Sequence, residues 1–217
     1  MSLSKRLFTC ARYTDGFVKL ADIGTDHALL PIHCINEGYV LNALAIDNKE
    51  GPYVIAFSNV KKQGLEDKIS VILSDGIKDI DDDVDVVVIS GMGGSLISDI
   101  LQKDPVRNVK RFVLQPNNDS KSIRRILKEI GFKLIDELVI KDNHKYYEIL
   151  VIEPGQQELT TFEEEFGPVN LKLKPHFFIE RIEKEIAKLE KVAKTLNNSS
   201  SSIGVKARIQ LLKEAIR

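Results

Sequence analysis

Short apolar runs alternate five times with segments of helical periodicity, and this alternation constrains the fold more than any other feature. We expect the apolar runs to be strands, and they cover residues 17–22, 40–46, 69–73, 84–89 and 111–114. The helical segments cover residues 28–36, 52–63, 95–102 and 120–130. Such alternation is typical of a parallel sheet with right-handed crossovers. The sequence therefore predicts an α/β fold with a doubly wound sheet.

Two more strands are expected at the end of this region. They cover residues 133–140 and 146–152, and the joint between them is short enough for an antiparallel hairpin. The complete sheet would then have seven strands and be mostly parallel. A short helix over residues 4–13 precedes it, with Lys5 and Arg6 among its exposed cations and Arg12 as the last of them.

Composition excludes several classes of protein. The chain has 217 residues, enough for one domain and an appendage, and a net charge of −1, which attracts it to no polyanion. Cys10 and Cys34 lie in helical patterns, where buried free thiols are expected. No apolar run approaches the roughly 18 residues that span a bilayer. We therefore expect a cytoplasmic monomer with no metal site and no membrane partner.

Acidic and glycine residues gather where four of the predicted strands end. They are Asp22 with Gly24, Asp47, Asp75 with Gly76, and the run 91–94. The carboxyl ends of parallel strands share one edge of a sheet, where doubly wound proteins bind their ligands. A single acid at a strand end is usually a helix cap or part of a turn. Four such positions in register are harder to explain in that way and indicate a ligand site.

The first of these strand ends opens a strand–turn–helix unit with Asp22, Gly24 and Asp26 in its turn. Gly24 lets a ligand approach the backbone closely. The two aspartates oppose a pyrophosphate but suit a ligand with a positive centre and a free amine. S-adenosylmethionine has a sulfonium and an α-amino group, so it is the predicted cofactor. The alternative is an ordinary turn of an α/β domain, because one glycine turn is weak evidence.

The next two strand ends offer partners for the rest of that cofactor. Asp47, with Asn48 beside it, lies about 25 residues beyond the glycine turn, where an acid accepts from both ribose hydroxyls. Asp75 is expected to accept from the adenine amino group, with Gly76 admitting the ring. The alternatives are a helix N-cap for Asp47 and a simple Asp-Gly turn for Asp75.

The glycine-rich run after the fourth strand is too flexible to be explained by structure alone. Gly91 and Gly93 would let the cofactor approach the backbone, while Met92 would pack on the face of the adenine. The alternative is a plain loop into the following helix.

The chain changes character from residue 158, and residues 163–165 and 167–168 are expected to be a linker. Beyond it, apolar residues spaced by three and four predict two amphipathic helices, separated by the polar residues 197–202. The first seam is Ile179, Ile182, Ile186, Leu189, Ala193 and Leu196. The second seam is Val205, Ile209, Leu212 and Ile216. We therefore predict two domains, residues 1–157 and 158–217, the second ending in an antiparallel coiled-coil hairpin.

The motifs at the strand ends also form a recognisable set. They are residues 20–31 (LADIGTDHALLP), 50–53 (EGPY), 74–76 (SDG), 91–94 (GMGG) and 115–117 (QPN). With residues 4–7 (SKRL) and 147–149 (YEI), the set resembles the bacterial tRNA (adenine-22-N1)-methyltransferases. The resemblance implies a class I Rossmann-like methyltransferase fold, S-adenosylmethionine as donor, and N1 of an adenine in the tRNA D-arm as acceptor. Leu29 and Asp47 depart from the family pattern, which has an aromatic residue and Glu there.

Methyl transfer to N1 of adenine needs no strong base, because that nitrogen carries a free lone pair near pH 7. The product base is cationic, so a nearby carboxylate would stabilise the developing charge. Asp26 is the first catalytic candidate and His27 the second, while Asn117 can hydrogen-bond the adenine edge. The alternatives are a helix N-cap for Asp26, packing for His27 and a turn for Asn117.

The implied tRNA substrate gives the C-terminal cations a role. From residue 172 to the end, 11 Lys and Arg residues accompany 5 Asp and Glu. One helix face is predicted to bind RNA phosphates through Arg181, Lys184, Lys188 and Lys191, although a solvated face is the alternative. A second stripe is expected to be solvated, and it consists of Lys121, Arg124, Arg125 and Lys128.

Two absences in the sequence narrow the chemistry. No Pro-Pro dipeptide occurs, so the Asn/Asp-Pro-Pro-aromatic motif of exocyclic-amine methylation is missing. No cysteine lies at a strand end, which argues against a covalent pyrimidine mechanism. Three alternatives stay open: a methyltransferase of a small molecule or protein, a dinucleotide-dependent oxidoreductase, and a non-catalytic adaptor. A dinucleotide-binding turn would have a second glycine at position 26 to admit the pyrophosphate. This chain has Asp26 there, which argues against the oxidoreductase.

Overall fold

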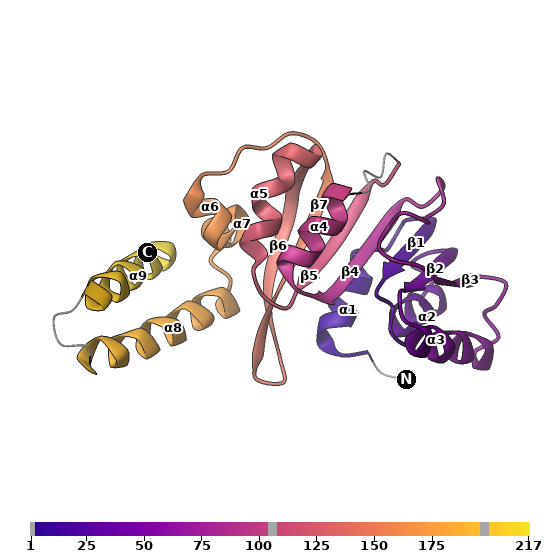
Figure 1. Ribbon diagram of the computed structural model, residues 1–217, viewed down its shortest axis with the longest axis horizontal. Helices are drawn as coiled ribbons and strands as arrows, with labels where there is room; N and C mark the ends of the chain where they lie inside the picture. Colours follow the sequence, from indigo (N-terminus) through magenta and orange to yellow (C-terminus); the bar gives the residue numbers. More distant parts are fainter. Residues whose placement is uncertain (1–2, 104–107, 196–199) are drawn as a thin grey trace.

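A computed structural model describes residues 3–103, 108–195 and 200–217, and it shows one twisted sheet with helices on both faces (Figure 1). The sheet has seven strands in the order β3-β2-β1-β4-β5-β7-β6. Strands β1 to β5 pair in parallel, and β7 pairs antiparallel with both β5 and β6. The predicted α/β fold with a doubly wound, mostly parallel sheet is therefore confirmed.

The elements have the following bounds. The strands are β1 Lys19–Ile23, β2 Asn42–Asp47, β3 Ile69–Leu73, β4 Val86–Met92, β5 Arg111–Pro116, β6 Phe132–Asp142 and β7 Lys145–Pro154. The helices over the sheet are α1 Lys5–Arg12, α2 Leu29–Asn36, α3 Glu50–Lys62, α4 Gly94–Lys103 and α5 Ser120–Ile130. The later helices are α6 Thr161–Phe166, α7 Pro168–Leu173, α8 His176–Thr195 and α9 Ser200–Ile216.

Several boundaries differ from the prediction, each for a local reason. Helix α2 begins one residue late because Ala28 is left-handed, with φ 56°. Strand β4 continues three residues beyond Ile89, since a bulge between Ser90 and Met92 keeps it paired with β5. The β6–β7 hairpin closes through Asn143 and His144, both at positive φ, so its turn is shorter than predicted.

Two apolar cores lie on opposite faces of the sheet. Helices α1, α2 and α3 cover one core, and helices α4 and α5 cover the other. Strand β4 serves both, because Val86 and Val88 face the first core while Val87 and Ile89 face the second. This double burial explains why β4 reads as a continuous apolar run.

The linker expected at residues 163–165 and 167–168 is wrong, because residues 163–165 belong to helix α6 and Pro168 begins helix α7. Thr160 and Glu163 make a reciprocal capping box that starts α6. Gly167 separates the two helices, and the next two amides, of Val169 and Asn170, donate to Glu137 on β6 at 2.9 and 3.1 Å. The segment is therefore fastened to the sheet.

Helices α8 and α9 form the expected C-terminal pair and pack together at one end of the molecule (Figure 1). Their shared core also includes residues from β6 and α6, and its buried members are Val139, Phe166, Phe178, Ile182, Ile186, Leu212 and Ala215. Leu196 and residues 197–199 of the predicted seam and joint lie outside the described residues. The helix pair is therefore continuous with the sheet domain through buried apolar contacts.

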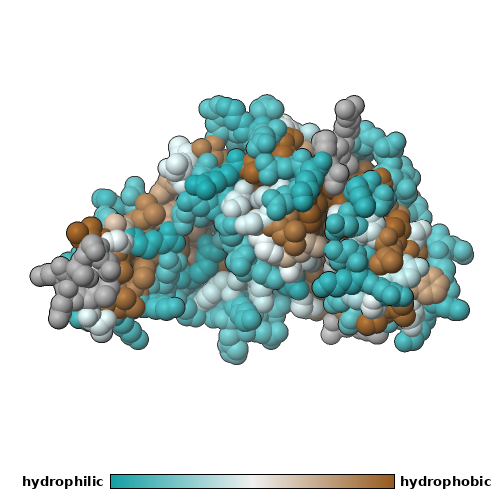
Figure 2. Space-filling model, viewed as in Figure 1, coloured by the Kyte–Doolittle hydropathy of each residue, from teal (hydrophilic) through white to brown (hydrophobic). Residues whose placement is uncertain are grey.

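The surface is mostly hydrophilic on the face that Figure 2 shows, with apolar patches toward both ends of the molecule. In the described parts of the chain, we find no helix with the length and apolar character needed to cross a membrane.

Candidate active site

A cavity of about 310 Å³ lies at the carboxyl ends of β1 and β4, under helix α1. Its lining residues are Arg6, Leu7, Asp22, Gly24, Thr25, Asp26, His27, Leu29, Leu30, Ser90 and Gly91. Five of the residues that the sequence singles out therefore meet in one cavity. The parallel topology brings them together, since both strands end at the same edge.

Asp22 is the buried acid of this cavity, with an exposed fraction of 4%. Its Oδ2 accepts a hydrogen bond from the Thr25 hydroxyl at 2.7 Å. Burial raises the pKa of Asp22 to about 7, although the Thr25 hydroxyl and the Arg6 guanidinium act to lower it. A cation bound beside Asp22 would favour its ionised form.

The turn after β1 is held by backbone hydrogen bonds and by close packing. The amides of Gly24 and Thr25 both donate to the carbonyl of Ile46, at 2.8 and 2.9 Å. A Cβ at Gly24, whose φ is +71°, would overlap the Met92 methyl group. Met92 therefore lies against this turn, and the positive φ favours glycine there.

Asp26 is not the helix cap that its position allowed. Helix α2 has Ala28 as its N-cap, with no side-chain hydrogen bond to the helix. The side chain of Asp26 is 71% exposed, and its Oδ1 lies 3.5 Å from Nε2 of His27. Asp26 is also left-handed, with φ 57°, and its amide donates to Asp47 Oδ2 at 3.1 Å. Its carboxylate is therefore available at the rim of the cavity.

Asp47, Asn48 and Asp75 gather at the same sheet edge but outside the 310 Å³ cavity. The N-cap residue of α3 is Lys49, which makes no side-chain hydrogen bond to the helix, so Asp47 is not the N-cap. Asp47 Oδ1 does accept a hydrogen bond from the Lys49 amide at 3.0 Å. Asn48 donates to Asp75 Oδ1 at 3.1 Å. Gly76 follows with φ +71°. These residues are therefore neighbours across the ends of β2 and β3.

The run 91–94 is more ordered than its glycines suggest. Its first two residues still belong to β4, and a Cβ at Gly94 would overlap the backbone oxygen of Asp119. The Gly94 amide also donates to the carbonyl of Asn118 at 3.1 Å. The run is therefore not a plain loop, because its first half is strand and Gly94 permits close packing against the β5–α5 loop.

Asn117 holds this pair of loops together. Its amide nitrogen Nδ2 donates to the carbonyl of Gly91 at 2.6 Å, and its backbone amide donates to the carbonyl of Met92 at 2.7 Å. Asn117 is nevertheless exposed to solvent.

Arg6 and Gln115 are site residues that the spacing of the strands does not reveal. Arg6 is half-buried rather than exposed as predicted, and it donates to Oε1 of the fully buried Gln115. The same oxygen accepts from the Gly91 amide at 3.1 Å. The only sequence signal for these two residues is the family resemblance, because Arg6 lies in the SKRL motif and Gln115 in the QPN motif.

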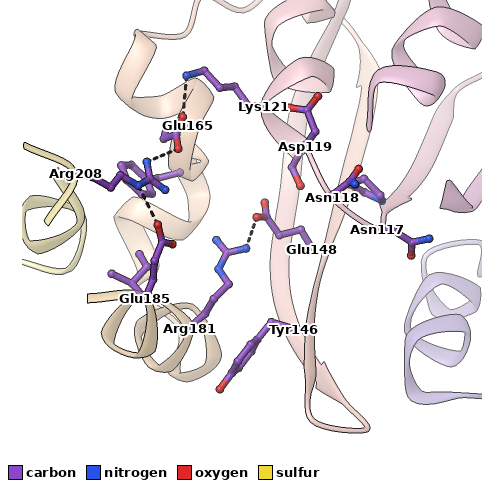
Figure 3. A pocket seen from close by; sticks show the side chains of 14 residues that line it. Asn117, Asn118, Asp119, Lys121, Tyr146, Glu148, Glu165, Arg181, Glu185 and Arg208 are labelled. Atoms are coloured by element: carbon purple, nitrogen blue, oxygen red, sulfur yellow. Dashed lines mark hydrogen bonds and ion pairs between the residues drawn. The ribbon is translucent and has the colours of Figure 1, made fainter. Parts of the chain in front are cut away.

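A second cavity, of about 370 Å³, separates the loop after β5 from helices α8 and α9 (Figure 3). Arg181 lines it and is paired with Glu148, while Lys184 donates to Tyr146 and Glu180. These hydrogen bonds raise the pKa of Lys184. Of the predicted phosphate-binding residues, three are exposed to solvent, namely Lys184, Lys188 and Lys191.

Arg124 contradicts the prediction of a solvated stripe on α5. It is 2% exposed, and its Nη2 lies 2.6 Å from Glu137 Oε2. It also pairs with Glu148, which Arg181 contacts from the other side. Burial opposes the charge of Glu148, but the two arginines outweigh it and lower the pKa of Glu148 to about 2.

The chain was compared with known proteins. A family model described as tRNA (adenine(22)-N(1))-methyltransferase matches residues 20–217. The tRNA (adenine(22)-N(1))-methyltransferase of Bacillus subtilis is 34% identical over 232 residues, covering 100% of this chain and 98% of that protein.

Two solved structures are also similar over their full length. A putative tRNA (m1A22) methyltransferase of Streptococcus pneumoniae, solved with S-adenosyl-L-methionine, is 36% identical with a TM-score of 0.92, covering 100% of both chains. The M. capricolum enzyme, solved with S-adenosyl-homocysteine, is 30% identical with a TM-score of 0.88, also covering 100% of both chains. The chain belongs to the tRNA (adenine(22)-N(1))-methyltransferase family.

Proposed function

We propose that the protein transfers a methyl group from S-adenosylmethionine to N1 of adenine 22 in the D-arm of tRNA. The observation that carries this proposal is the cavity in which Asp22, Gly24, Asp26, His27 and Gly91 meet. Relatives of the same family were solved with the donor or its product, and they align over the full chain.

The cavity suits the methionine end of the donor. That end carries an ammonium and a carboxylate, and the cavity offers the carboxylate of Asp22 and the guanidinium of Arg6. Asp22 would accept from the α-amino group, and Arg6 would donate to the carboxylate of the donor. Both groups already have fixed positions through Thr25 and Gln115.

The ends of β2 and β3 suit the adenosine end. Two backbone amides use two of the roughly four acceptor positions of Asp47, which leaves positions for the ribose hydroxyls. Asn48 and Asp75 lie beside it, and Asp75 would accept from the adenine amino group next to Gly76. Met92 would contact the face of that adenine, and Gly93 would allow its close approach.

The chemistry asks the protein mainly for positioning. When bound, S-adenosylmethionine supplies a methyl group that its sulfonium has already activated. Orientation of the two reactants can lower the barrier by about 7–11 kcal/mol. Asp26, with His27 beside it, would stabilise the positive charge that develops on the adenine, and Asn117 would hydrogen-bond the edge of the base.

The two parts of the chain would divide the work. Residues 1–157 would bind the donor, and residues 158–217 would bind tRNA as one structural unit. Phosphates would contact Lys188 and Lys191 on α8, with Arg181 and Lys184 nearer the cavity. We expect the enzyme to act as a monomer in the cytoplasm, where it meets tRNA.

A methylation assay tests this function directly. Labelled donor and unmodified tRNA transcripts are incubated with the protein, and the product nucleoside is mapped by mass spectrometry. We expect 1-methyladenosine at position 22 and no product when that adenine is replaced by guanine. Donor binding without transfer to tRNA would favour the non-catalytic adaptor, and turnover without RNA would favour another substrate.

A further inference from the structure

The 370 Å³ cavity of Figure 3 lies next to the proposed donor site. Asn117 lines this cavity, Gly91 lines the donor cavity, and the Asn117 amide donates to the Gly91 carbonyl at 2.6 Å. One hydrogen-bonded connection therefore lies between the two cavities. An RNA strand bound at the donor cavity would therefore also lie near the second one.

The wall between the two cavities is rigid. Gly94 donates to the Asn118 carbonyl at 3.1 Å, and Asp119 leaves no room for a side chain at Gly94. Asp119 also fixes the start of α5, where it accepts from the amide and hydroxyl of Ser122. Ligands in the two cavities would therefore sit at a fixed spacing.

Three cations and four carboxylates line the second cavity, so its lining has no excess of positive charge (Figure 3). Each of its cations contacts a carboxylate, through the pairs Lys121–Glu165, Arg208–Glu165, Arg208–Glu185 and Arg181–Glu148. A phosphate would have to displace one of these carboxylates from its partner. A neutral heterocycle would not have to displace a carboxylate. A guanidinium has five N–H donors and a carboxylate about four acceptor positions, so both can make further hydrogen bonds while they stay paired. The lining therefore suits a nucleobase better than a phosphate.

The arginine on the α8 side of this cavity is positioned from the core. Glu148 holds Arg181 and is itself held by Arg124, whose side chain is fully buried together with that of Glu137. Removing such charges from water is costly, so a buried network of this kind contributes to one defined geometry more than to stability. The cavity is thus preformed rather than a gap between two loosely packed parts.

We propose that this cavity binds the nucleobase adjacent to the target adenine in the same RNA strand. The assignment rests on the methyltransferase activity proposed above. Proteins that recognise RNA by sequence commonly splay out neighbouring bases and hydrogen-bond their edges. Here the target base would lie at the rim of the donor cavity beside Asp26, and its neighbour would contact Arg181, Arg208 and Asn118.

Removing either the base or its protein partner tests this site. Affinity is measured for intact tRNA and for transcripts with an abasic nucleotide on the 5′ or the 3′ side of adenine 22. The protein variant is Arg208→Gln, which leaves Glu165 paired with Lys121 and Glu185 partly open to solvent. The matched control is Lys213→Gln, which removes the same charge from α9 at an exposed pair with Glu190.

The effects of the abasic nucleotide and of Arg208→Gln on tRNA affinity should not be additive. In the wild type, one abasic position should weaken binding about 10-fold, a typical loss for one base contact. Arg208→Gln should weaken binding of intact tRNA by a similar factor, but its affinity for the same abasic tRNA should equal that of the wild type. Lys213→Gln should weaken both RNAs equally.

Two outcomes would overturn the base site. One is a wild type that binds both abasic transcripts as tightly as intact tRNA. The other is an Arg208→Gln variant that weakens intact and abasic tRNA by the same factor, which would indicate a phosphate contact. Unchanged donor affinity of Arg208→Gln, measured by calorimetry, shows that the variant is folded. Failure of the wild type to methylate intact tRNA would count against the proposed function, and this separate assay distinguishes the two.

Discussion

At the scale of single residues, the buried Asp22 lowers the folding stability of the donor-free protein when it is ionised, while its charge is expected to bind the donor. Burial raises its pKa from 3.8 to about 7, so the folded protein favours the protonated acid. The stability that this gives is complete below the unfolded pKa of 3.8 and is lost as the pH rises toward 7. A donor cation beside Asp22 would stabilise the charged form instead.

Replacing Asp22 by Asn separates these two effects. The variant can still accept from Thr25 but carries no charge. Without donor, it should be more stable than the wild type above pH 7 by about 1–3 kcal/mol, and this difference should shrink toward pH 4. Its donor affinity should fall about 10- to 100-fold. Thermal melts across pH and calorimetry measure both, and unchanged donor affinity would refute the assigned role.

A second residue-scale prediction concerns Asp26. Asn tolerates the left-handed backbone at this position and keeps the backbone hydrogen bond to Asp47. We expect Asp26→Asn to lower the single-turnover rate about 10-fold or more, because the developing charge loses its partner. Affinities for donor and tRNA should stay within about two-fold of the wild type. An equal loss in rate and in donor affinity would point to a binding role instead.

At the scale of elements, local periodicity decides what the sequence can predict. The strands and helices of the sheet each carry their own apolar period, so their order could be predicted. Helices α6 and α7 have six residues each, too few for a clear period, and their stability depends on contacts with α5 and β6. Arg124 was misassigned for a similar reason, since its partners Glu137 and Glu148 lie 13 and 24 residues away.

The residues of the candidate site also divide into those that the sequence could predict and those that it could not. The acids and glycines at the strand ends could be predicted because parallel strands end at one edge. Arg6 and Gln115 could not be predicted from spacing, because their contact joins α1 to β5 across the fold. The tight packing of Gly94 was missed because a glycine run has the same sequence whether it is flexible or closely packed.

The contact between the β4–α4 and β5–α5 loops gives an element-scale prediction. Gly94→Ala adds a methyl group where the Asp119 backbone lies, so the loops must separate. We expect a loss of about 1–3 kcal/mol in unfolding free energy and a reduced methylation rate. The control is Gly204→Ala in α9, where nothing lies within 4 Å, and it should be neutral or slightly stabilising. Denaturant titrations compare the two, and equal stabilities would contradict the packing argument.

At the scale of the whole molecule, catalysis and RNA binding are expected in different parts of the structure. The donor cavity lies at the sheet edge, and helix α8 lies at one end of the molecule (Figure 1). Lys188 and Lys191 are exposed on its predicted RNA-binding face, as is Lys184, which hydrogen-bonds Tyr146 and Glu180. A neutral chain can hold tRNA in this way, because the phosphate contacts depend on local rather than net charge.

Charge reversal tests this division. Lys188→Glu with Lys191→Glu should weaken tRNA binding by about 10-fold or more and reduce its salt dependence, while donor affinity stays unchanged. The matched control reverses Lys61 and Lys62, which are exposed on α3 at the other end of the molecule (Figure 1). Filter binding across a salt series measures the effect. Equal losses for both double variants would show that α8 has no special part in RNA binding.

The ion pairs beneath α8 also limit how the chain can be shortened. A truncated chain that stops before His176 would leave Glu148 with a single guanidinium and uncover the apolar side chains of Val139 and Phe166. An isolated sheet domain would therefore expose apolar surface and should aggregate more readily than the chain of 217 residues. Insertions or deletions in this protein should accordingly be tolerated in surface loops and rejected at the α7–α8 junction.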